Sequence, residues 1–199
     1  MRKIFLTAVL TLALCLPTGA ASAMGLIDVS NPAGGSQVGW TFSNNVFTVT
    51  GDVLITGTTT TNRVVVASGA DVNILFNGVN INYPGWGIWQ PGALHILPGA
   101  AVDLTLIGSN ELSGPTGLQV PQGATLTING SGSLTATGHG GGADIGGGLG
   151  GDGGFINIEG NAVVTAINNG ISSAGINGRV IIEGSAVVTA SKTKCRGKN

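Results

Sequence analysis

The chain has 199 residues, of which 36 are glycine and only 9% are charged. Between positions 24 and 190 its nine carboxylates are accompanied by two cations, Arg63 and Arg179, while the other basic residues lie near the two termini. Because an acidic body repels phosphates, this composition excludes nucleic acid as a partner.

Residues 1–23 are expected to be a secretory signal peptide. Arg2 and Lys3 form a positive start, an apolar run follows from Ile4 to Leu16, and Ala21-Ser22-Ala23 has the small residues of a cleavage site. The apolar run is too short to span a bilayer. We therefore expect a secreted, extracellular protein with no membrane partner after cleavage; the alternative is a location at the cell surface.

Residues 24–50 are expected to form an N-terminal cap region. They contain Trp40, Phe42, Phe47 and Val49, which can cover the first layer of the structure that follows. A cap is needed because an uncovered end of stacked strands exposes unpaired strand edges.

Residues 51–190 repeat a pattern in which two short apolar runs flank a glycine. The clearest copies, Ile156 to Ala166 and Val180 to Ala190, are identical at eight of eleven positions. A unit of about 20 to 30 residues built from short strands is typical of stacked coils, each of which buries its face against the next. Parallel crossovers take the right hand. We predict an all-β fold, a right-handed parallel β-helix (a solenoid) of about five to six coils. The repeated glycines are Gly78, Gly108, Gly130, Gly160 and Gly184.

Side-chain parity predicts which residues of each copy face inward. In the fourth copy Ile156, Ile158 and Val164 share one parity, whereas Asn157 and Glu159 take the other and should face water. The glycine between the two runs should let the backbone turn from one face to the next.

Several segments of this region resemble a known family. Thr58 to Gly69, Gly117 to Ile128 and Gly132 to Gly138 are similar to segments of secreted surface proteins from Gram-positive bacteria. Gly142 to Gly148 resembles their Gly-Ala-Gly-Ile-Gly-Gly-Gly element, with Asp144 in place of a glycine. The resemblance implies a β-helical carbohydrate-binding or adhesin-like repeat domain, and some proteins of this kind bind acidic polysaccharide.

The segment Tyr83-Pro-Gly-Trp-Gly-Ile-Trp89 gathers three aromatic residues in one loop. Aromatic faces stack on sugar rings. We expect Trp86, which is flanked by glycines, to be the stacking residue, with Tyr83 and Trp89 as further ligand-binding candidates. The alternative is that Trp89 packs in the core and Tyr83 covers it.

Three acidic residues are candidate metal ligands, with calcium as the candidate cofactor. Glu159 and Glu183 occupy equivalent outward positions on adjacent copies, and stacked strands lie about 4.8 Å apart, so a cation between them would relieve their repulsion. Asp152 ends Gly147 to Asp152, which matches the start of a calcium-binding nonapeptide. The alternatives are a solvated pair of glutamates and a flexible glycine turn.

No catalytic residues are identified. Hydrolysis of a glycoside needs two carboxylates across a cleft, and no spacing here indicates such a pair. His95 and His139 lack a nucleophilic partner or metal-ligand spacing. We therefore expect a non-catalytic carbohydrate-binding or adhesin-like module, not an enzyme, whose partner is a polysaccharide or cell-surface glycan. The alternatives are a structural surface or spacer module without its own ligand, and a degenerate polysaccharide lyase.

Residues 191–199 are expected to be a basic, unstructured tail. The fifth copy ends at Ala190 and nothing after it has capping character, so the last coil should present unpaired strand edges. Two alternatives are open: the chain is a fragment of a longer member of its family, or two copies associate through this coil, with Cys195 able to form a disulfide in an oxidising exterior.

Overall fold

The computed structural model describes residues 23–32, 35–85, 91–169 and 174–192. Every regular element in these ranges is a β-strand, which confirms the all-β prediction. The same ranges hold no helix with the length and hydropathy needed to cross a membrane. The predicted signal peptide, up to residue 22, and Cys195 lie outside the described residues.

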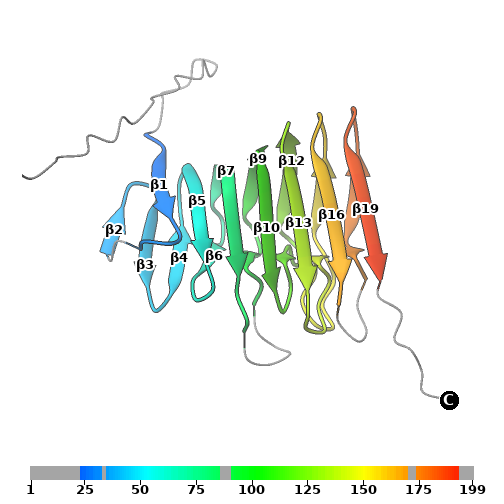
Figure 1. The fold of residues 1–199 in the computed structure, drawn as a ribbon, viewed down its shortest axis with the longest axis horizontal. Helices are drawn as coiled ribbons and strands as arrows, with labels where there is room; N and C mark the ends of the chain where they lie inside the picture. The colour runs from blue at the N-terminus through cyan, green and yellow to red at the C-terminus, as the bar shows by residue number, and fades with distance from the viewer. Residues whose placement is uncertain (1–22, 33–34, 86–90, 170–173, 193–199) are drawn as a thin grey trace, which may run out of the picture.

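The strands belong to two sheets. The larger sheet consists of β1 (Gly25–Asp28), β5 (Val53–Thr59), β7 (Asp71–Asn82), β9 (Ala101–Ile107), β10 (Ser109–Gly114), β12 (Thr125–Gly130), β13 (Ser133–Gly138), β15 (Phe155–Ile158), β16 (Val163–Asn168), β18 (Arg179–Ile182) and β19 (Val187–Lys192). The smaller sheet consists of β2 (Gly35–Gln37), β3 (Trp40–Ser43), β4 (Val46–Val49), β6 (Arg63–Val66), β8 (Leu94–Ile96), β11 (Leu118–Gln119), β14 (Ile145–Gly146) and β17 (Ile176–Asn177). Strands of successive layers lie side by side along the long axis (Figure 1).

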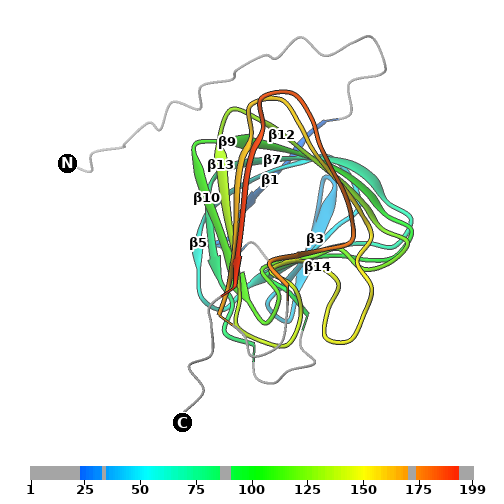
Figure 2. The ribbon, with the colours of Figure 1, turned by 90° about the vertical axis from the view of Figure 1, so that its right-hand side faces the viewer.

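The predicted right-handed parallel β-helix of about five to six coils with an N-terminal cap is wrong as a description of this architecture. Nine parallel strands follow one hydrogen-bonded path, β18-β15-β12-β9-β7-β10-β13-β16-β19, and form a nearly closed barrel rather than a clear solenoid. Seen along the long axis, the chain traces a ring (Figure 2). The cause lies in β7, whose first part pairs with β9 and whose last residues pair with β10, so that two sides of the ring join in a single sheet.

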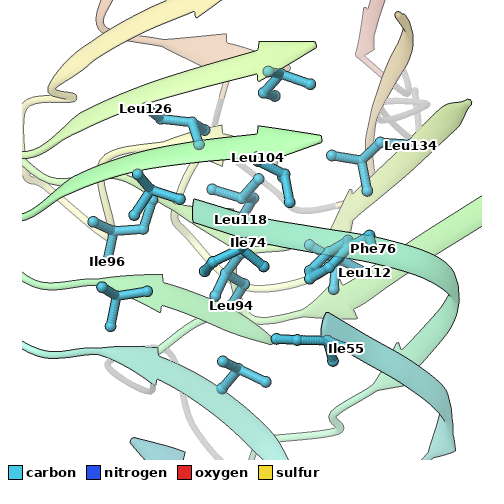
Figure 3. Packing of buried hydrophobic residues seen from close by; sticks show 14 of the residues in the cluster. Ile55, Ile74, Phe76, Leu94, Ile96, Leu104, Leu112, Leu118, Leu126 and Leu134 are labelled. Atoms are coloured by element: carbon cyan, nitrogen blue, oxygen red, sulfur yellow. The ribbon is translucent and has the colours of Figure 1, made fainter. Parts of the chain in front are cut away.

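The register of the parallel strands accounts for the repeated sequence. Ile156 pairs with Leu126 on one side and with Val180 on the other, and Ile158 pairs with Ile128 and Ile182. These positions point into the ring, where side chains of successive layers pack on one another (Figure 3). Ile156 and Ile158 are fully buried, as parity predicts.

The repeated glycines turn the backbone as expected. All five have a positive φ, between 64° and 100°, which L-residues rarely adopt. Gly160 itself is exposed at its turn, although its parity is that of the inward residues. The turn glycines are Gly78, Gly108, Gly130, Gly160 and Gly184.

The glycine tract between β13 and β15 is closely packed at positions on either side of Gly147 to Asp152, whose interpretation as a flexible turn stays a prediction. A Cβ at Gly146 or Gly153 would collide with the backbone carbonyl oxygen of Asn177 in the next layer. A Cβ at Gly142 would likewise collide with the Thr116 hydroxyl. Glycine is needed at Gly146 and Gly153 because neighbouring backbone comes too near for any side chain.

Antiparallel strands form the first part of the smaller sheet, at the N-terminal end of the molecule. β3 pairs with β2 and with β4, and β4 then continues in parallel with β6. Trp40 packs edge-on against Phe47 with ring centroids 5.4 Å apart, and Phe42 lies 4.5 Å from the same ring. These rings extend the core to this end of the molecule.

Candidate functional site: an outer polar groove

An open depression of about 280 Å³ lies where β7, β10 and β13 run side by side. We call it the outer groove. Strand register places Asn80, Glu111 and Thr135 in one row, because Glu111 pairs with Asn80 on one side and with Thr135 on the other. Their parity is opposite to that of the buried residues, so the row faces outward. The lining residues are Gly78, Val79, Asn80, Ser109, Asn110, Glu111, Ser133 and Thr135.

The groove offers a carboxylate, an amide and several hydroxyls to a ligand. Asn80 Nδ2 donates a hydrogen bond of 3.3 Å to Glu111 Oε2, which leaves the other carboxylate oxygen of the exposed Glu111 directed to solvent or ligand. Thr135 is half-buried and adds a hydroxyl that can donate and accept. Such a set suits a ligand with many hydroxyl groups. Among the residues that line the groove, Glu111 alone carries a carboxylate.

Asn110 fixes the shape of the groove from beneath. Its side chain is buried, accepts a hydrogen bond from the Val79 amide and donates to the carbonyl oxygens of Ile107 and Ser133, at 3.0 to 3.1 Å. One side chain thereby joins β7, β10 and β13 at the corner of the ring. Sequence analysis missed it, although an asparagine at a position of inward parity just after Gly108 is the signal that could have found it.

The aromatic loop is only partly within the described residues. Tyr83 directly follows β7, where its amide donates 2.8 Å to the Ser113 carbonyl and its half-buried ring packs against the core. Gly85 sits against Pro115 and the Tyr83 ring. Tyr83 therefore contacts the core, and its role in ligand binding stays a prediction. Trp86 and Trp89 lie outside the described residues, so their roles stay predictions.

The three candidate metal ligands are not brought together. Glu159 and Glu183 do occupy equivalent positions, since each amide donates to the carbonyl of the layer before, Glu159 to Ile128 and Glu183 to Ile158. Asp152, however, precedes β15 whereas Glu159 follows it, so the two lie at opposite ends of that strand. Within the described part of the chain, no group of three His, Cys, Asp or Glu side chains is arranged to hold a metal ion.

Glu159 instead belongs to a row of acidic and amide side chains outside β9, β12 and β15. Asn129 Nδ2 donates to Asp103 Oδ1 at 2.5 Å, and Asn157 Nδ2 donates to Glu159 Oε2 at 2.9 Å. Partial burial raises the pKa of Asp103; the Asn129 hydrogen bond opposes this shift, and the charge of Glu159 adds to it. Each of these two carboxylates therefore accepts a hydrogen bond from a side-chain amide.

Asp144, unlike the acidic residues on the outer surface, has a fully buried side chain. Its Oδ1 accepts hydrogen bonds from the Gly138 amide at 2.7 Å and from Asn168 Nδ2 at 3.4 Å. Its Oδ2 has no hydrogen-bond partner among the described residues. Burial raises the pKa of Asp144 to about 7, against the opposing effect of the two hydrogen bonds. This carboxyl holds a proton under mildly acidic conditions.

His95 of β8 lies beside Val65 of β6 in a partly buried position. Burial, and then the positive charge of Arg63, lower the pKa of His95 to about 4. The imidazole is therefore neutral near pH 7, where a general acid would need its proton.

Comparisons of the chain with models of protein families, with curated protein sequences and with solved structures find no match.

Proposed function

We propose that this protein is an exported, non-catalytic module that binds a carbohydrate in the outer groove. The observation behind the proposal is the row of Asn80, Glu111 and Thr135, whose carboxylate, amide and hydroxyl groups line one open depression. Sugar hydroxyls donate and accept hydrogen bonds and match such a set. The groove lies on regular strands fixed from beneath by Asn110, so it is preformed.

Binding fits this groove better than hydrolysis does. Glycosidases use two carboxyl groups separated by about 5 to 10 Å, one on each side of the scissile bond. The groove residues provide Glu111 and no second acid. A single carboxylate that also accepts a hydrogen bond from Asn80 is suited to orienting a sugar, which is a binding role.

The test uses retention on immobilised neutral, acidic and amino-sugar polysaccharides, each with calcium or with a chelator. We expect Glu111→Gln and Thr135→Val each to weaken retention on the preferred polymer about tenfold, or roughly 1.4 kcal/mol. Thr165→Val is the matched control, since Thr165 pairs with Thr135 in the next layer but does not line the groove.

Three other outcomes would move the binding site or contradict carbohydrate binding. Retention that survives both groove changes but is lost with Trp86→Ala would move the site to the aromatic loop. Retention that is lost on adding the chelator, and also lost in Glu159→Gln, would favour a calcium-dependent site at Glu159 and Glu183. No retention on any polymer would contradict carbohydrate binding and leave the structural spacer as the function.

A further inference from the structure

The two ends of the molecule differ in how well their inward residues are covered. At the N-terminal end Ile27 in β1 is fully buried, and Trp40 is almost so. At the opposite end Val180 and Ile182 of β18 remain 37% and 53% exposed, although their register partners Ile156 and Ile158 are fully buried. The last layer therefore presents an apolar surface that would be core if another layer followed.

The strands of this layer also have one unpaired edge. β18 and β19 are the two ends of the nine-strand path, and β17 is the last strand of the smaller sheet. The described part of the chain provides a neighbour on one side only for each of them. An exposed edge of this kind is a template for pairing with another strand.

The residues of β18 are complementary to themselves when two copies run antiparallel. A pairing centred on Ile181 places Val180 opposite Ile182 of the second copy, on the inward side. It also places the exposed Arg179 opposite the exposed Glu183 of the second copy, on the outward side. Both kinds of cross-strand pair, apolar and oppositely charged, stabilise antiparallel strands. A parallel, head-to-tail arrangement would instead meet the covered N-terminal end.

We propose that this end of the molecule is an interface with a second copy of the same chain, formed by antiparallel pairing of β18 with β18 about a two-fold axis. In such an isologous contact each copy offers the same surface, so the assembly closes as a dimer. The interface is separate from the outer groove, which lies on β7, β10 and β13 and stays open to solvent.

Sedimentation velocity of the secreted protein over a wide concentration range tests the proposal, with Cys195→Ser in every variant so that disulfides do not contribute. We expect a reversible dimer. Glu183→Arg places two arginines opposite each other and should raise the dissociation constant about tenfold. The double variant Arg179→Glu/Glu183→Arg restores opposite charges and should recover most of the affinity.

Leu26→Lys is the control, since Leu26 is 59% exposed on β1 at the other end and should not affect the dimer. Because Arg179 also lies over the Phe155 ring at 5.3 Å, melting curves of all variants check that folding is preserved. A monomer at every concentration overturns the proposal. So does a dimer that Glu183→Arg leaves intact, or one that Leu26→Lys disrupts.

Discussion

The buried carboxyl of Asp144 links the stability of the protein to pH. Its folded-state pKa of about 7 lies above the ordinary value of 3.8, so the folded protein holds a proton that the unfolded chain releases. This contribution to stability is fully present below about pH 4. It is lost progressively as the pH rises to about 7, at up to about 1.4 kcal/mol per pH unit.

We expect Asp144→Asn to remove this dependence, because the amide keeps the Oδ1 acceptor for Gly138 and cannot ionise. Denaturant unfolding of the two proteins at pH 4, 5.5, 7 and 8 measures the difference. Asp152→Asn, at an exposed position, is the control and should follow the original protein. Parallel curves for Asp144→Asn and the original protein would show that Asp144 is already ionised at pH 4.

At the scale of the elements, the glycine tract is held by its contact with the next layer. Gly146→Ala should destabilise the protein by more than about 2 kcal/mol, because its φ is +130° and the new Cβ would collide with the Asn177 carbonyl. Gly150→Ala is the matched control. Its φ is +67° and its Cβ would meet no atom within 4 Å, so only the conformational cost of about 1 to 2 kcal/mol remains. Equal losses in urea unfolding would contradict close packing at β14.

The strands and turns also show which features of the fold could be predicted from the sequence and which could not. Parity correctly placed Ile156 and Ile158 inside, and the repeated glycines correctly marked the turns. The groove could not be predicted in this way. Gly78 and Gly108 are 30 residues apart, which would set Asn80 opposite Asn110, yet the strands pair Asn80 with Glu111. A one-residue difference in register at a corner decides which side chain faces outward.

The sequence also could not predict that β7 joins two sides of the ring in one sheet, for a related reason. The pattern in Asp71–Asn82 does not show that the strand continues past Gly78 as a single β7. That continuity depends on partners on both sides, β9 before the corner and β10 after it. Likewise nothing local in the sequence shows that Asn110 would be the side chain that ties the corner together.

At the scale of the whole molecule, an isoleucine at equivalent register positions contributes more to the free energy of unfolding in the interior than at the open end. Ile158→Ala removes a fully buried side chain and should cost about 2 to 5 kcal/mol, whereas Ile182→Ala, at the register position one layer on, should cost less than about 1 kcal/mol. Guanidinium unfolding at low protein concentration, where the chain is monomeric, makes the comparison. A large loss for Ile182→Ala under these conditions would mean that the last layer is covered within one chain.

The constant register between the last layers bears on how a gene for such a chain could lengthen. Phe155 pairs with Arg179 and Val163 pairs with Val187, so both sides of the ring advance by the same 24 residues. An in-frame tandem duplication of the codons for residues 155–178 would therefore add one complete layer. The added layer would precede Arg179, so its inward residues would pack between Ile156 and Ile158 on one side and Val180 and Ile182 on the other. Longer molecules can thus arise by duplication of an internal layer without redesign of the existing core, while Val180 and Ile182 remain at the open end.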